Sequence, residues 1–188
     1  MTGSVMTPAP DTTTVGGSVA HDAGFMLVRA VPALGLGYHG LQKLRNPEGA
    51  AGLFEAFGFP APQATAVLTG SLEVAVALLL LIGALTTLAA AGVIGIMTVA
   101  ITRVHWDFGF PFDAGAAPGA PAPVPGYEYP LALLLVAAAL AATGPGRRSV
   151  DATVLRRLPG PVRGGSLVAL AVAVVLGVVG GGLVSALA

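Results

Sequence analysis

The sequence has no cysteine and very little charge. Only 10% of its 188 residues are Asp, Glu, Lys or Arg, and nine basic residues balance nine acidic ones. Without cysteine there is no disulfide, thiol catalysis, iron–sulfur cluster or cysteine-bound zinc, so a redox role needs a bound cofactor, a quinone or a partner protein. The even charge balance argues against nucleic acid as a partner, because phosphate binding needs a basic surface.

The residues that are abundant are apolar. They make up 55% of the chain and charged residues only 10%, whereas about a quarter of the residues of a soluble domain are charged. This composition predicts an all-α membrane protein, because each backbone group must find its partner inside its own helix in lipid. Five apolar segments are long enough to be considered as spans, and the second and third are so close that they must form a tight hairpin. The expected spans are residues 23–44, 64–83, 85–104, 129–143 and 167–188.

The chain divides into four parts by composition. Residues 1–21 are rich in Thr, Gly, Ser and Pro and are expected to form a disordered polar tail. Residues 22–155 hold the first four spans, 156–166 form a basic linker, and 167–188 form the fifth span.

Basic residues on cytoplasmic loops set the orientation of membrane proteins. Here they cluster after the fourth span, which predicts a cytoplasmic amino terminus and places the loops 45–63 and 105–126 together on the outer side. The residues that carry this prediction, and that also offer a surface for membrane headgroups or a docking partner, are Arg147, Arg148, Arg156 and Arg157.

Both outer loops have features of their own. Residues 47–60 place apolar side chains at helical spacing and predict a short helix at the membrane interface. The segment 105–112 reads HWDFGFPF and leads into a Pro/Ala/Gly stretch that ends at Gly126. It is interpreted either as an aromatic belt with a flexible linker or as a lid over an outward-facing cavity.

Ionisable residues inside spans are costly and normally find partners within the bundle. At 100° per residue, Arg29, His39 and Lys43 share one face of the first span. Glu73 lies near the middle of the second span. We expect a buried Arg29–Glu73 ion pair, either as a structural pin or with a role in proton or substrate handling.

A second polar group gathers where three helices end on the outer side. Its members are His39, Gln42 and Lys43 closing the first span, Arg103, His105 and Asp107 closing the third, and Tyr127, Glu128 and Tyr129 opening the fourth. No spacing puts two metal ligands on one helix, so no metal site is predicted. The cluster is interpreted as a pocket for a polar headgroup or a quinone ring, or as ordinary interfacial anchoring.

Five segments follow one another in a characteristic order: RAVPALGLGYHGLQKL at 29–44, GSLEVAVALLLLIGALTT at 70–87, HWDFGFPF at 105–112, GYEYPLALLL at 126–135 and GPGRRSVDATV at 144–154. Together they resemble the DoxX family of small bacterial inner-membrane proteins. The resemblance, from Gly24 to Val154, implies a four-helix transmembrane bundle to which the fifth span is an additional C-terminal transmembrane helix. The residues it carries over are Arg29, His39, Gly40, Lys43, Glu73, Glu128, Gly144, Pro145, Gly146, Ser149 and Asp151.

The same resemblance implies kinship with the membrane subunit of thiosulfate:quinone oxidoreductase and with oxidative-stress complexes. Three functions follow as hypotheses: a quinone-linked membrane subunit of a redox complex, a non-enzymatic anchor for a soluble oxidoreductase, and a small-solute or lipid-handling bundle. The sequence leaves open whether the chain is itself an enzyme. Lipid and another subunit are expected partners. Small residues at every fourth position of 167–188 also suggest a homo-oligomer through the fifth span.

Overall fold

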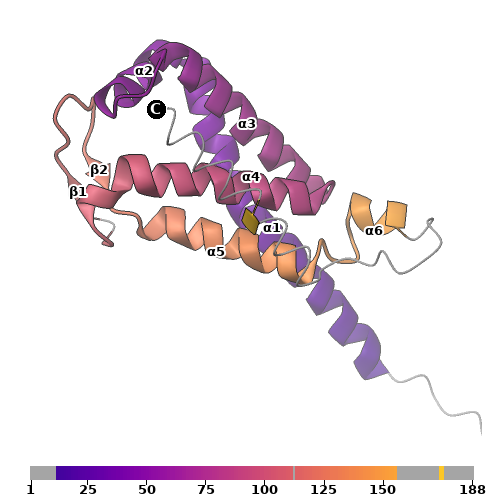
Figure 1. Ribbon diagram of the computed structural model, residues 1–188. Helices are drawn as coiled ribbons and strands as arrows, with labels where there is room; N and C mark the ends of the chain where they lie inside the picture. Colours follow the sequence, from indigo (N-terminus) through magenta and orange to yellow (C-terminus); the bar gives the residue numbers. More distant parts are fainter. Residues whose placement is uncertain (1–11, 112, 156–173, 176–188) are drawn as a thin grey trace, which may run out of the picture.

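The computed structural model describes residues 12–111, 113–155 and 174–175. The predicted linker and fifth span lie outside the described residues apart from Val174 and Val175, and so do Arg156 and Arg157. Figure 1 shows the order of the elements along the chain. They are α1 (Thr12–Arg45), α2 (Pro47–Ala56), α3 (Pro62–Ile82), α4 (Thr86–Val99), η1 (Ala100–His105), η2 (Trp106–Phe108), β1 (Ala114–Gly115), β2 (Val124–Pro125), α5 (Glu128–Thr143) and α6 (Val150–Leu155).

Three described helices are long and apolar enough to cross a membrane. They cover Val19–Arg45, Pro62–Ile82 and Thr86–Phe108, which confirms a mostly helical protein with spans at the first three predicted positions. The helix α5 is apolar but shorter, at 16 residues. It coincides with the predicted fourth span.

The first helix starts earlier than the sequence predicted. Residues 12–21 belong to α1, so the expectation of a disordered tail extending to residue 21 is wrong for this part. Extending an existing helix adds one hydrogen bond per residue without a new nucleus. Beyond this extension, the rings of His21 and Phe25 lie 4.8 Å apart and Asp22 lies 3.7 Å from the Arg148 guanidinium.

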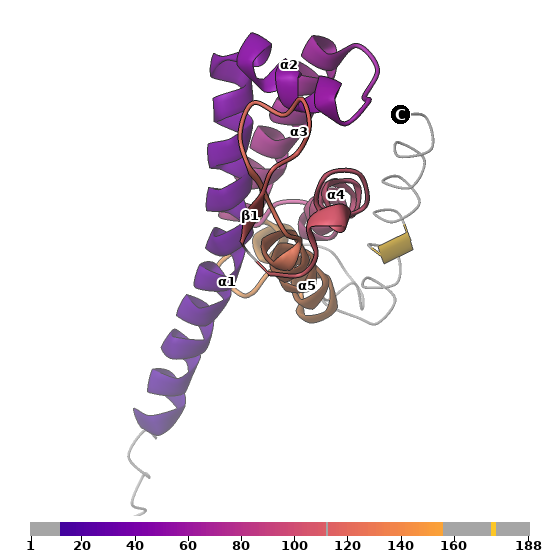
Figure 2. The same ribbon diagram turned by 90° about the vertical axis from the view of Figure 1, so that its left-hand side faces the viewer.

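The helices pack as two pairs. Helix α3 returns antiparallel along α1 after the short helix α2, and α4 lies beside α5, as both views show (Figures 1 and 2). The predicted hairpin between α3 and α4 turns within residues 83–85, where Gly83 and Leu85 have φ angles of 65° and 47°.

This arrangement gives the bundle two ends. The α2 end holds the last turn of α1, α2, the start of α3, the end of η1 and the loop that leads to α5. The turn end holds the α3–α4 turn, the end of α5 and the start of α6. Both predicted outer loops lie at the α2 end.

The core between the four helices is apolar, and nearly half of its buried residues are alanine. Ala33 and Leu36 of α1 contribute to it together with buried residues of α3, α4 and α5. Among the most buried are Leu80, Ala90, Val93, Ile94, Ala137 and Leu140. Small side chains let helices approach closely. Close packing favours helix association in a membrane, because lipid tails are as apolar as the side chains and burial there gives no hydrophobic gain. A second cluster under α2 forms from Phe54, Phe59 and Ala66.

Candidate functional site

Two glycines mark the point where α1 crosses α3. A Cβ atom added to Gly40 would lie 2.7 Å from the carbonyl oxygen of Gly70, and one added to Gly70 would lie 3.0 Å from the carbonyl oxygen of Gly40. Any side chain at either position would push the backbones apart. The contact therefore fixes the register of the two helices and determines which polar groups of α1 and α3 can meet.

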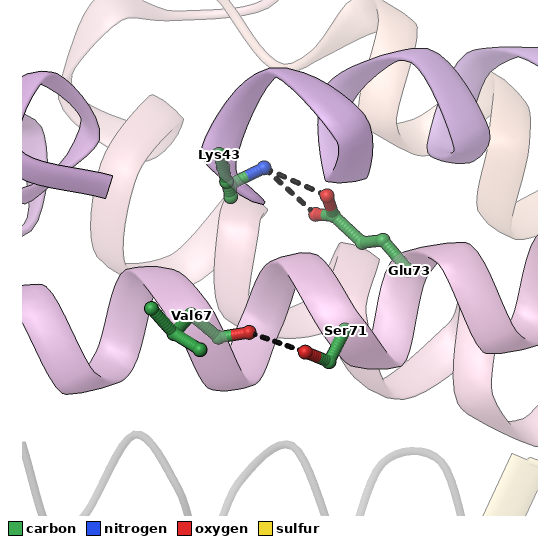
Figure 3. Close-up of polar contacts among 4 residues, drawn as sticks. All are labelled: Lys43, Val67, Ser71 and Glu73. Atoms are coloured by element: carbon green, nitrogen blue, oxygen red, sulfur yellow. Dashed lines mark hydrogen bonds and ion pairs between the residues drawn. The ribbon is translucent and has the colours of Figure 1, made fainter. Parts of the chain in front are cut away.

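A buried ion pair forms directly beside this crossing. The Lys43 ammonium lies 2.8 Å and 3.0 Å from the two carboxylate oxygens of Glu73. Figure 3 shows the two side chains reaching toward one another from α1 and α3. Their side chains are 18% and 7% exposed, respectively. On the same helix the hydroxyl of Ser71 donates to the Val67 carbonyl (2.8 Å) instead of joining the pair.

The expected Arg29–Glu73 pair is wrong, and helix register explains why. Arg29 lies eleven residues before Gly40. Because α1 and α3 are antiparallel, the α3 residues level with Arg29 lie about eleven residues after Gly70, and the Arg29 guanidinium packs against Gly83. Helical side chains lean toward the start of their helix. Lys43 therefore leans back toward the level of Gly40, and Glu73 toward the level of Gly70.

A cavity of about 560 Å³ opens at the α2 end beside this pair. The predicted site residues His39, Lys43 and His105 line it. Glu73 does not line the cavity itself but binds the Lys43 ammonium. The polar lining comes mostly from the last turn of α1 and the apolar lining from α2, η1 and the loop before α5. The remaining lining residues are Gln42, Arg45, Asn46, Gly49, Ala50, Leu53, Phe54, Val104, Pro121, Ala122, Pro123, Val124 and Pro125.

The position of His105 depends on a change of helix type. Helix α4 continues as the π-helix η1, which ends at His105; π segments inside α-helices are rare and often lie at functional sites. The ring atom Nδ1 lies 2.7 Å from the Pro125 carbonyl oxygen. Because a carbonyl only accepts hydrogen bonds, Nδ1 carries the proton and the neutral ring keeps Nε2 as its acceptor.

The segment after His105 forms one wall of the cavity. Its strands β1 and β2 pair antiparallel, and backbone hydrogen bonds from Gly126 to Pro111 and from Tyr127 to Gly109 close its base. Trp106 stacks on Tyr127 with ring centroids 5.5 Å apart. Residues 121–125 line the cavity.

Two predicted site residues lie elsewhere. Glu128 is exposed at the first position of α5, where its backbone N–H donates to the Phe110 carbonyl, and it does not line the cavity. Arg29 lies at the turn end. Arg45 and Asn46 also line the cavity, although the sequence did not predict them there. Asn46 is followed by Pro47, an arrangement typical of a helix start, and its side chain accepts from Gly49 as the cap of α2.

Arg29 belongs to a polar network at the turn end. Its guanidinium donates to the carbonyls of Pro145 (2.7 Å) and Arg148 (2.8 Å), and its side chain is buried, with 2% exposed. The two carbonyls follow the break at Gly144, where α5 ends as predicted. A buried cation is thus compensated by backbone acceptors of another segment rather than by an acid on α3.

Asp151 completes the same network. Its two carboxylate oxygens accept the backbone N–H groups of Leu85 and Thr86, each at 2.8 Å. These are the first free N–H groups of α4, whose own N-cap residue supplies no side-chain acceptor. The Ser149 hydroxyl accepts from the Ala152 N–H and caps α6. The GPGRRSVD segment is therefore a structural connector between α1, the α3–α4 turn and α5, while Arg147 and Arg148 remain exposed.

Within the described part of the chain, no three His, Asp or Glu side chains form a group suited to a metal ion. What the described residues define is a helical membrane protein with a polar, cation-bearing cavity at one end of its bundle. Residues 24–106 match the DoxX family model. This confirms the resemblance predicted from the sequence, although the matched range ends before the loop and α5. No curated protein and no solved structure matches the chain.

Proposed function

We propose that this chain is a DoxX-type membrane subunit of a quinone-linked redox complex and that the cavity at the α2 end receives the quinone headgroup. The observation that carries the proposal is that one cavity brings His39, Lys43 and His105 together with apolar residues of α2, η1 and the loop before α5. Most of this lining lies in the DoxX-matched residues. Lipid surrounds the apolar faces of the spans, so a hydrophobic ligand has direct access to the protein.

The dimensions and chemistry of the cavity suit a substituted ring. Its volume of about 560 Å³ lies within the range typical of small-molecule sites. The Lys43 ammonium donates to both oxygens of Glu73 and still has a proton left for a ligand. Asn46 offers its amide N–H groups, so two donors are available for the oxygens of a quinone. Nε2 of His105 is an acceptor for a quinol hydroxyl. Leu53, Phe54 and Val104 supply apolar contacts for the ring.

Binding of a quinone is testable with the chain's own fluorescence. Trp106 is its single tryptophan and directly follows the cavity residue His105. Menadione added to the purified protein in detergent is expected to quench this fluorescence saturably, with at least about tenfold weaker binding in a His39→Ala/His105→Ala variant. Arg147→Ala, at the opposite end, is the matched control. Quenching that never saturates, or that is equal in all three proteins, contradicts the proposal. Thiosulfate-dependent quinone reduction in membranes that contain the chain tests the redox complex itself.

An anchor for a soluble oxidoreductase is the second candidate. It is favoured by the exposure of Arg147 and Arg148 beside the structural connector at the turn end. Neutralising Arg147, Arg148, Arg156 and Arg157 together is expected to remove a soluble partner that co-purifies with the wild-type protein. The partner would persist after the cavity substitutions, which separates this function from the first.

We further propose that the protein lies in the bacterial inner membrane with the turn end and the amino terminus in the cytoplasm. Arg147 and Arg148 at that end satisfy the positive-inside rule. Because the native chain has no cysteine, single cysteines report the orientation cleanly. A membrane-impermeant thiol reagent added to intact spheroplasts should label Ala116→Cys in the loop at the α2 end and leave Arg147→Cys unlabelled. The reverse pattern would invert the orientation.

A further inference from the structure

We propose that Glu73 determines the charge preference of the cavity: by holding the Lys43 ammonium, it keeps the inner wall electrically neutral, so the cavity selects an uncharged ligand over an anionic one. Glu73 is a positioning residue here, since it acts through Lys43 and does not itself line the cavity. The inference rests on the proposed ligand site and adds the reason for its choice of ligand.

The geometry supports a fixed ion pair rather than a mobile lysine. Both carboxylate oxygens accept from the same ammonium, at 2.8 Å and 3.0 Å, and Glu73 has no other side-chain hydrogen bond among the described residues. The glycine contact between Gly40 and Gly70 fixes the two helices immediately beside the pair. Figure 3 shows the Lys43 side chain directed at the carboxylate across this crossing.

Among the residues that the structure describes, no acidic side chain lines the cavity, so the charge of its wall depends on what Lys43 meets outside the lining. The other permanent cation of the lining, Arg45, is exposed and lies where water and salt screen it. The Lys43 side chain is only 18% exposed, and a charge in such surroundings acts more strongly on a ligand than a screened one. Removing the Glu73 charge therefore turns a neutral inner wall into a cationic one.

The experiment compares a neutral ring with an anionic ring of similar shape. Menadione and naphthoquinone sulfonate are titrated against the purified full-length protein, with Trp106 quenching as the readout. The wild-type protein is expected to prefer menadione. In Glu73→Gln the ratio of the two affinities should move toward the sulfonate by about tenfold or more. Glu55→Gln is the matched control, because it removes an exposed acid of α2 that lies outside the lining.

Two further variants keep the test decisive if Glu73→Gln folds poorly. Lys43→Gln should move the preference the other way, further against the sulfonate, and Lys43→Gln/Glu73→Gln should return to near the wild-type ratio. Helix content by circular dichroism identifies proteins that are folded. A ratio that is unchanged by both single substitutions overturns the inference. Failure of the wild-type protein to bind either ring overturns the proposed ligand site instead, so the two failures are distinguishable.

Discussion

Gly40 of α1 and Gly70 of α3 meet backbone to backbone at the helix crossing, with the carbonyl oxygen of each directed at the space where the other would carry a side chain. This single contact sets the register of the pair. It brings Lys43 to Glu73, leaves Arg29 beside the α3–α4 turn, and so separates the charges of the bundle between its two ends.

Replacing Gly40 by Ala should destabilise the protein. The new Cβ would lie 2.7 Å from the Gly70 oxygen and 2.9 Å from a methyl group of Val74, and such overpacking typically costs about 1–3 kcal/mol. Gly24→Ala is the control on the same helix, because nothing lies within 4 Å of the added atom there. Thermal unfolding in detergent should show a lower midpoint for the first variant and an unchanged or higher one for the second. Equal midpoints would mean that the helices do not meet at this point.

Substitution of Asp151 should weaken the start of α4. Asp151→Ala removes both acceptors of the Leu85 and Thr86 N–H groups, and loss of a helix cap costs about 0.5–2 kcal/mol. Asp151→Asn keeps one acceptor oxygen and should lie in between. Asp113→Ala, in the exposed loop at the other end, should behave as wild type in the same chemical unfolding series. A ranking in which Asp113 matters as much as Asp151 would contradict the capping role.

Arg29→Lys should loosen the connector at the turn end. A lysine keeps the charge but lacks the planar fork that reaches the Pro145 and Arg148 carbonyls together. Limited trypsin digestion measures the effect, because Arg147 and Arg148 are natural cleavage sites in the connector. We expect faster cleavage there in Arg29→Lys and no change in Arg103→Lys, which alters an arginine at the α2 end. A connector equally resistant in both variants would show that Arg29 does not hold it.

The interpretation of the loop before α5 as a lid predicts that fixing this loop to α2 slows ligand exchange with the cavity. A Cβ at Gly52 on α2 would lie 3.8 Å from Cγ of Pro121, so α2 and the loop are in contact at this point and a cysteine pair there can be tested for cross-linking. Oxidised Gly52→Cys/Pro121→Cys protein should take up menadione more slowly than the reduced form in stopped-flow quenching. Each single-cysteine variant, treated with the same oxidant, should keep the wild-type rate. Equal rates in the cross-linked and reduced double variant would leave the loop as a wall without a gating role.

The sequence predicted the elements far better than their partners. Apolar runs at 64–83 and 85–104 predicted α3, α4 and the tight turn between them, because span length and hydropathy are properties of one segment. The α2 helix was predicted from its apolar spacing. The partner of Glu73 was not predicted correctly, since a helical wheel shows only that Arg29 and Lys43 share a face of α1. Which of the two meets Glu73 depends on the Gly40–Gly70 contact, a property of two segments together.

The same limit explains Asp151. In the sequence, nothing near Asp151 indicates α4 as its partner. Its bonds to Leu85 and Thr86 span 66 and 65 residues, so only the packed bundle reveals them. Likewise, His105 was predicted as a pocket residue from its place at a helix end, whereas the π-helix that orients it left no sequence signal that we recognise.

The carbonyls that accept from Arg29 and the carboxylate that caps α4 lie at residues 145–151, so during synthesis they follow the helices that they stabilise. Translation delivers α1, α3 and α4 well before the ribosome reaches residues 145–151, so the hairpin enters the bilayer with a bare helix start and a guanidinium that lacks its carbonyls. The DoxX-matched stretch 24–106 is consequently not a unit that completes itself. A nascent chain stopped at residue 106 should remain a target for membrane quality-control proteases, whereas one that has released Asp151 should escape them.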